Sequence, residues 1–226
     1  MKEYRQHRFT APPGATQIIL VRHGESRAAS PDKPFALIDG QGDPELAPAG
    51  REQALQVRQR LQGQTIDAIY VTSLQRTVET AAPLAAHLGL TPIVEPDLRE
   101  VHLGDWEGGL LRIKVHDNDP IYLQMQQEQR WDVIPGAESR DKIHARVDRA
   151  ITKIAAAHPD QTVVAVVHGG IVGHIMSHAA GAAHFAFNGC DNGSISQIVI
   201  TEGRWVVRGF NETSHLQSGS ASALPT

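Results

Sequence analysis

The stretch Gln17–Ser26, QIILVRHGES, changes from apolar to polar residues at the point that decides the fold. Its first five residues have the length and apolar content of a buried strand, and an arginine, a histidine and a glycine follow directly. A core strand needs none of these three residues at its end. Their position therefore indicates a functional site at the edge of a sheet.

The composition is that of an ordinary globular chain. It has 226 residues, of which 41% are apolar and 20% charged, enough for one domain with a sizeable core and at most a small cap. The formal charge of -4 excludes a generally basic surface, so we expect neither nucleic acid nor a membrane as a partner. The lone Cys190 and the absence of a signal-peptide pattern predict a cytoplasmic location.

Strand and helix signals alternate along the chain, which predicts an α/β fold of three layers, with a mostly parallel central sheet flanked by helices. The expected strands are QIILV (17–21), IDAIYV (66–71) and TVVAVV (162–167), followed by ISQIVI (195–200) and WVVR (205–208) as a hairpin at the sheet edge. Apolar residues at helical spacing from Gly50 to Leu61 and from Ile143 to Ile154 predict two covering helices. A third helix is expected from about Leu74 to Leu88, ending at Gly89, with Pro83 as a point of interruption.

Polar clusters follow three of these strands: RHGES (22–26), TSLQRTVET (72–80) and HGG (168–170). Because the carboxyl ends of parallel strands converge on one crevice, we expect Arg22, His23, Arg76 and His168 to meet. Two guanidiniums and two imidazoles repel one another unless an anion neutralises them, and a guanidinium matches phosphate oxygens in pairs. The predicted ligand is a phosphoryl group, which Gly169 at a helix start also favours.

Four blocks in this order, RHGES, SLQRTVETA, LREVHLGDWEG and VVHGG, resemble the histidine phosphatase superfamily, also called the phosphoglycerate mutase-like fold. The resemblance spans about Gln17 to Ser196. It implies a single catalytic domain at 16–211. The residues themselves predict a flexible segment at 1–15, which contains TAPPGA, a small helical cap inserted at about 109–136, which contains IYLQMQQEQRW, and a flexible tail at 212–226, which contains SGSASALPT. RHG alone is a weak signal, whereas four blocks in register are a specific one.

The resemblance also implies roles for these residues. His23 would attack phosphorus and form a phosphohistidine that water later removes, while Arg22, Arg76, His168 and Gly169 hold the phosphoryl oxygens. No metal or other cofactor is implied. The carboxylates of DLREVHLGDWEG that could protonate the leaving group are Asp97, Glu100, Asp105 and Glu107. The residues alone do not choose among them, and the resemblance points to Glu100.

Supporting roles are expected for Glu25, Ser26, Ser73 and Glu79, which flank the blocks. Many relatives carry an asparagine in the phosphate pocket where this chain has Ala29, so one phosphate contact is expected to be missing or replaced. His174 and His178, one helical turn apart, could ligate zinc, but HIMSH lacks the glutamate of the HExxH pattern, and a helix face is the stronger interpretation.

A phosphomonoester hydrolase acting on a small phosphorylated substrate is favoured over two alternatives. A mutase needs extra cations for a second anionic group, and the loop after RHGES offers only Arg27 and Lys33. A non-catalytic module that binds a phosphorylated ligand would be expected to lack the nucleophile, which is present here as His23. The sequence leaves open the individual substrate, the pH optimum and whether the chain forms a homo-oligomer.

Overall fold

A computed structural model describes residues 3–216 of the chain, so most of the tail predicted at 212–226 lies outside the described residues. Within 3–216 the main sheet has six strands in the order β5-β4-β6-β1-β7-β8. Their bounds are β1 Thr16–Arg22, β4 Ala68–Val71, β5 Ile93–Val94, β6 Thr162–Val167, β7 Ile195–Thr201 and β8 Arg204–Glu212. Strands β5, β4, β6 and β1 run parallel to one another, whereas β7 is antiparallel to β1 and forms an antiparallel hairpin with the edge strand β8. The mostly parallel sheet and its edge hairpin are confirmed.

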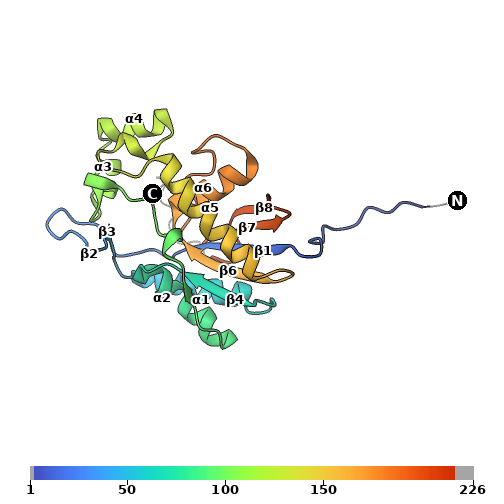
Figure 1. Cartoon of the computed structure of the whole chain (residues 1–226). Coiled ribbons are helices and arrows are strands. Elements are labelled where there is room, and N and C mark those ends of the chain that lie inside the picture. Colours follow the sequence, from blue (N-terminus) through green and yellow to red (C-terminus); the bar gives the residue numbers. More distant parts are fainter. Residues whose placement is uncertain (1–2, 217–226) are drawn as a thin grey trace.

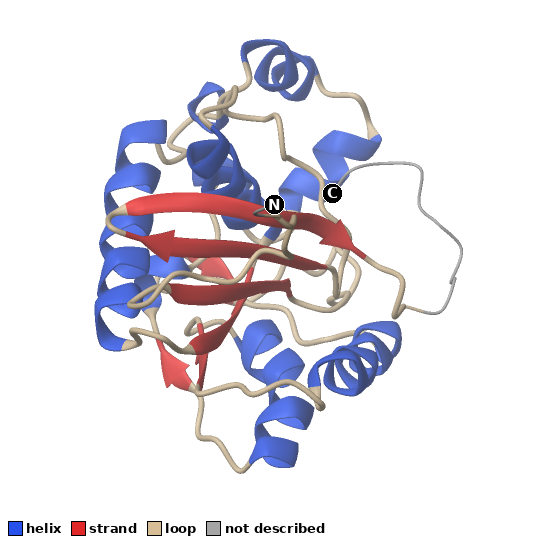
Figure 2. Ribbon diagram, turned by 90° about the vertical axis from the view of Figure 1, so that its right-hand side faces the viewer, coloured by secondary structure: helices blue, strands red, loops and turns tan. Residues whose placement is uncertain are grey.

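Two apolar cores lie on opposite faces of this sheet, because successive residues of β1 point to opposite sides. Ile18 and Leu20 belong to the core beneath α5 (Arg140–Ala157) and α6 (Gly169–Ala180). Ile19 and Val21 belong to the other core, beneath α1 (Pro48–Leu61) and α2 (Gln75–Leu88). Figures 1 and 2 show these helices on both sides of the strands. The predicted three-layer arrangement is therefore confirmed.

The helices end close to where the sequence pattern placed them. Helix α2 ends at Leu88, and Gly89 takes the left-handed conformation, φ +67°, that favours glycine at this position. Pro83 lies inside α2, which continues past it to Leu88. The predicted faces of α1 and α5 are buried, including Ala54 and Val57 on α1.

A small cap stands at one end of the molecule (Figure 1). It contains α3 (Leu110–His116), α4 (Pro120–Glu128) and the 3-10 turn η3 (Trp131–Val133), which lie within the insertion expected at 109–136. The cap has an apolar cluster of its own around Trp106, Met125 and Ile134. Three shorter elements, the β2–β3 ladder (Leu37–Ile38 with Gln41–Gly42), η1 (Pro96–Leu98) and η2 (Gly104–Trp106), lie in the segments that connect the sheet and the cap.

The residues just before β1 and just after β8 are held to the domain by hydrogen bonds. The Gly14 N–H donates to the Asp160 carboxylate at 2.6 Å, just before β1 begins. At the other end β8 runs to Glu212, and the His215 ring nitrogen Nε2 lies 3.0 Å from the Gly193 carbonyl. The domain bounds implied by the resemblance stay a prediction. Among the described residues, no helix has the length and apolar character to cross a membrane.

Candidate active site

The loop after β1 is clamped against the first turn of α1 by two glycines. A Cβ on Gly24 would lie 2.4 Å from the Gly50 carbonyl oxygen, and one on Gly50 would lie 2.0 Å from the Glu25 carbonyl oxygen. Either side chain would force the backbone apart, so the RHG turn needs glycine for close packing. The Gly24 N–H donates to Thr80 Oγ1 at 3.0 Å, so its amide is engaged with α2.

His23, directly after β1, presents one ring nitrogen to the site and uses the other to fix its orientation. Its Nδ1 lies 2.7 Å from the Gly24 carbonyl, which can only accept, so Nδ1 carries the proton. Arg76 Nε lies 3.2 Å from His23 Nε2 and can only donate, so Nε2 presents its lone pair. Burial, then the charges of Arg76 and Arg22, hold the pKa of His23 well below its usual value. The imidazole is therefore neutral, with Nε2 as its unprotonated nitrogen, which accepts a hydrogen bond from Arg76.

Both predicted arginines are buried, and their charges act on this imidazole. Arg76 at the start of α2 also donates Nη1 to the Gly42 carbonyl at 2.9 Å and lies 4.0 Å from Asp43. Arg22 at the end of β1 donates Nη1 to the Cys190 carbonyl. A Cβ on Gly169 would lie 3.2 Å from Arg22 Nε, so the glycine makes room for this guanidinium. Gly170, rather than Gly169, lines the cavity.

His168 caps α6 and is fully buried beside His23, with the two ring centroids 5.2 Å apart. Burial and the charge of Arg76 hold the pKa of His168 well below its usual value. Its Nε2 lies 3.1 Å from Thr72 Oγ1, and its buried Nδ1 has no hydrogen-bond partner among the described residues. The sequence analysis singled out Ser73 in this segment, and the structure shows that the neighbouring Thr72 makes the contact.

Of the four carboxylates considered as proton donors, Glu100 and Glu107 line the cavity. Asp97 pairs instead with Arg149 at 2.8 Å. Glu100 accepts the Val101 N–H at 3.0 Å on one oxygen and the Gly170 N–H at 3.2 Å on the other. These two bonds aim the carboxyl group at the start of α6, close to His168.

Arg112, on α3 of the cap, is a cation that the sequence analysis did not count. Its Nη2 donates to Ser26 Oγ at 2.7 Å and its Nη1 to the Arg27 carbonyl at 2.9 Å. Burial, followed by the charges of Arg76 and Arg22, lowers the pKa of Arg112 to about 10. All three guanidiniums line one cavity. Ser26, expected to have a supporting role, orients Arg112.

The other expected supporting residues lie further from His23. Glu79 accepts the Leu46 N–H at 3.0 Å and so braces α2 against the segment before α1. Glu25 is exposed, and its carboxylate forms no ion pair within 4 Å among the described residues. The buried Ser73 Oγ has no hydrogen-bond partner among them. Their support of the site stays a prediction.

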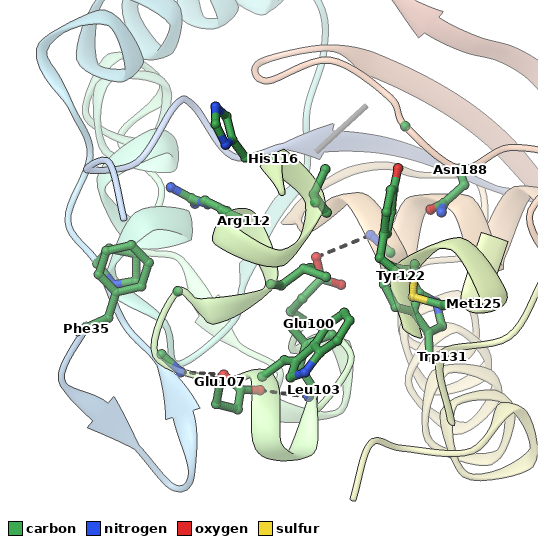
Figure 3. Close-up of a pocket in the computed structure, with 18 of the residues that line it drawn as sticks. Phe35, Glu100, Leu103, Glu107, Arg112, His116, Tyr122, Met125, Trp131 and Asn188 are labelled. Carbon is green, nitrogen blue, oxygen red and sulfur yellow. Dashed lines mark hydrogen bonds between the residues drawn. The ribbon is translucent and has the colours of Figure 1, made fainter. Parts of the chain in front are cut away.

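A cavity of about 1270 Å³, counting its open mouth, lies between the sheet and the cap and is lined by Arg22, His23, Arg76, Glu100 and Arg112. His168 is fully buried beside His23 and does not line it. Figure 3 shows Phe35 and Arg112 on one side of it and Tyr122, Met125 and Trp131 on the opposite side, with Glu100 between them. One end of the cavity therefore holds arginines and a neutral imidazole, and its remaining walls are largely aromatic and aliphatic.

His174 and His178 lie away from this cavity, in a cluster of imidazoles with His144 and His184. Ring centroids within the cluster are 4.6 to 5.7 Å apart. In the described part of the chain, no three histidine, cysteine or carboxylate side chains are arranged to hold a metal ion. Burial, then the neighbouring imidazoles His184, His144 and His178, lowers the pKa of His174 to about 3.

This cluster predicts that acid destabilises the fold. The pKa of His174 is below the ordinary value of 6.5 in the folded chain, so the unfolded state binds more protons between pH 6.5 and 3. The free energy of unfolding should then be highest above pH 6.5 and fall by about 1.4 kcal/mol per pH unit for this histidine as pH drops. We expect His174→Gln to flatten the slope by about that amount between pH 6 and 4, as measured by urea unfolding. His116→Gln, at an exposed site, should leave the slope unchanged.

A neutral imidazole among guanidiniums, at the carboxyl end of a mostly parallel sheet, is the site of a protein that transfers or hydrolyses phosphoryl groups. A family model described as the histidine phosphatase superfamily (branch 1) matches residues 18–213. The chain belongs to this superfamily, as the resemblance indicated.

Named relatives include both phosphatases and mutase-like proteins. The chain is 34% identical to phosphoglycerate mutase-like protein 4 of Arabidopsis thaliana over 206 residues, 89% of this chain and 87% of the relative. It is 31% identical to phosphoserine phosphatase 1 of Hydrogenobacter thermophilus, covering 88% of this chain and 94% of the relative. The structure of a mycobacterial glucosyl-3-phosphoglycerate phosphatase matches with a TM-score of 0.73 at 28% identity, over 87% of this chain and 99% of that one. The predicted enzyme class, a histidine-type phosphatase, is confirmed.

Proposed function

We propose that this chain hydrolyses small phosphomonoesters through a phosphohistidine formed on Nε2 of His23. The observation that carries the proposal is the neutral imidazole with its lone pair presented beside Arg76 Nε at 3.2 Å. An imidazole held neutral by burial and by arginines can attack phosphorus, and the same arginines attract the dianionic phosphoryl group. The cytoplasmic location expected from the sequence is part of this proposal.

In the first step, the His23 Nε2 lone pair forms a bond to phosphorus while the bond from phosphorus to the alcohol oxygen breaks. Glu100, held by the N–H groups of Val101 and Gly170, gives its proton to the departing oxygen. The Gly24 carbonyl, 2.7 Å from Nδ1, stabilises the positive charge that the ring gains when Nε2 is phosphorylated. The products of this step are the free alcohol and a phosphohistidine.

In the second step, a water molecule attacks phosphorus from the side the alcohol has left. The Glu100 carboxylate takes a proton from this water as the bond from phosphorus to Nε2 breaks. Inorganic phosphate leaves, and both His23 and Glu100 return to their starting protonation states. Water is the one co-reactant that the cycle needs.

Charge on the three phosphoryl oxygens is balanced by Arg22, Arg76 and Arg112. We propose that Arg112, held by Ser26, supplies the contact expected to be missing where relatives carry an asparagine and this chain has Ala29. The buried Nδ1 of His168, without a partner among the described residues, is available to donate to a further oxygen. Such preorganised donors account for most of the rate enhancement in phosphoryl transfer.

Hydrolysis is favoured over mutase activity by the walls of the cavity. A mutase must keep its intermediate bound while it turns, which requires cations for a second anionic group. Arg112 adds one cation to the Arg27 and Lys33 counted in the sequence, but it lies with Arg22 and Arg76 at the phosphate end. The opposite wall is formed by Tyr122 and other apolar side chains.

The test of this function is a comparison of phosphate release with phosphate relocation. We expect the purified chain to release inorganic phosphate and alcohol in equal amounts from para-nitrophenyl phosphate. With 3-phosphoglycerate it should form no 2-phosphoglycerate. Interconversion of the two phosphoglycerates without net phosphate loss would support the mutase alternative, and the absence of both reactions would support a binding module.

Replacing Arg112 tests whether the cap contributes to phosphate binding. We expect Arg112→Met to lower kcat/KM roughly 10- to 100-fold for every phosphomonoester, because one charged donor to the phosphoryl oxygens is lost. Lys114→Met, on the same helix, removes an ion pair to Asp119 outside the cavity and should change kcat/KM little. A loss confined to substrates that carry a carboxylate would instead assign Arg112 to the leaving group.

A further inference from the structure

We infer that the alcohol part of the substrate is apolar, at least as large as an aromatic ring, and carries no carboxylate beside the ester oxygen. This inference rests on the proposed function, because it concerns the same cavity. It is drawn from the side chains that surround the space beyond the phosphate end.

The walls beyond the phosphate end are made largely by the cap and the loop before it. The apolar side chains that line them are Leu103, Trp106, Leu111, Tyr122, Met125 and Trp131. Figure 3 shows Tyr122, Met125 and Trp131 together on the side of the cavity opposite Arg112. An alcohol placed between them exchanges water contacts for contacts with aromatic and aliphatic carbon.

These side chains belong to the core of the cap, which makes the wall well defined. Trp106 and Met125 are 4% and 1% exposed and form the centre of the cap cluster. Leu111, Tyr122 and Trp131 pack around that centre and are only partly buried. The cap therefore buries Trp106 and Met125 and leaves the partly exposed side chains around them facing the cavity.

The charges in the cavity disfavour a second anionic group. Both Glu107 oxygens accept backbone N–H groups, from Leu103 at 2.9 Å and Gly42 at 2.9 Å, which holds this acidic side chain in the wall. Arg112 is tied to the Ser26 side of the site. His116 is exposed at the rim and lies 3.1 Å from the Asp117 carboxylate. A carboxylate beside the ester would face Glu107 without a cation dedicated to it among the described residues.

The inference is tested with alkyl phosphates whose leaving groups are similar, so that differences in kcat/KM report contacts with the cavity walls and not the reactivity of the ester. We would measure kcat/KM for 2-phenylethyl phosphate, ethyl phosphate, O-phosphoserine and 3-phosphoglycerate. We expect 2-phenylethyl phosphate to exceed each of the others by about 30-fold or more, the scale of discrimination that an apolar pocket gives for a group of this size.

The outcomes of this panel distinguish failure of the inference from failure of the proposed function on which it rests. Equal values for all four esters, or a preference for O-phosphoserine or 3-phosphoglycerate, would overturn the apolar class while leaving the phosphatase proposal intact. Release of phosphate from none of the esters, and none from para-nitrophenyl phosphate, would overturn both.

Two neighbouring residues of α4 provide a matched pair of variants. Tyr122 lines the cavity, whereas Leu123 is 52% exposed and does not. We expect Tyr122→Ser to lower the ratio of kcat/KM for 2-phenylethyl phosphate over ethyl phosphate by about tenfold. Leu123→Ser should leave the ratio unchanged. Because misfolding lowers both rates together, an unchanged ratio in Tyr122→Ser would contradict the inference.

Discussion

His23→Ala is expected to reduce kcat by at least about 10⁴-fold, the order seen when a nucleophile is removed from an enzyme that forms a covalent intermediate. Alanine has no atom that can bond to phosphorus, and water is not an efficient replacement for the imidazole. The fold should persist, since the side chain makes its hydrogen bonds to the local Gly24 carbonyl and to Arg76. Steady-state turnover of para-nitrophenyl phosphate and the thermal unfolding midpoint would measure both effects.

Trapping of the intermediate provides a more specific readout than the rate. Substrate labelled on phosphorus and quenched in base within one turnover should leave label on the wild-type chain, with the acid lability of a phosphohistidine. His23→Ala should take up none, whereas His87→Ala, at an exposed position of α2, should label as the wild type does. Label retained by His23→Ala would place the nucleophile elsewhere and contradict the proposed mechanism.

The grouping of His23, Arg22, Arg76 and His168 could be predicted because each follows a recognisable strand or opens the helix after it. Parallel strands bring their carboxyl ends to one edge whatever the loops do, so topology alone places these residues together. The contact of 3.2 Å between Arg76 and His23, and the edge-to-face contact of the His168 ring with His23, agree with that expectation.

Arg112 and Thr72 could not be predicted in the same way. Arg112 lies on a cap helix whose placement over the sheet depends on the packing of its apolar cluster, which no periodicity along the chain specifies. Thr72 and Ser73 are adjacent hydroxyl residues, and only the end geometry of β4 decides which one reaches His168. The sequence pattern also missed the tight contact of Gly24 with Gly50, because it joins two segments distant in the chain.

The neutral state of His23 has a consequence for the order of events at the site. Burial and two arginines disfavour the imidazolium before substrate binds, and the dianionic phosphoryl group then offsets the arginine charges. In the proposed mechanism, phosphorylation of Nε2 gives the ring positive charge only when that group is in place. The site therefore favours charge on His23 in the presence of substrate and disfavours it in the empty enzyme.

Glu100→Gln is expected to lower kcat/KM for 2-phenylethyl phosphate by roughly 10²- to 10⁴-fold, the contribution of a positioned general acid. An alkoxide is a poor leaving group without a proton, and glutamine cannot supply one. For para-nitrophenyl phosphate the loss should be much smaller, because the departing phenolate is stable unprotonated. Measuring kcat/KM for both substrates in the same preparation shows how strongly the loss of activity depends on the leaving group.

Glu107→Gln is the matched control, because Glu107 lines the same cavity and, like Glu100, accepts two backbone N–H groups, here those of Leu103 and Gly42. Its replacement disturbs the wall and should slow both substrates by a similar factor. If Glu107→Gln shows the dependence on the leaving group and Glu100→Gln does not, then Glu107 is the proton donor. If the rate loss depends on the leaving group in neither variant, the proton comes from solvent, because Glu100 and Glu107 are the two carboxylates that line the described cavity.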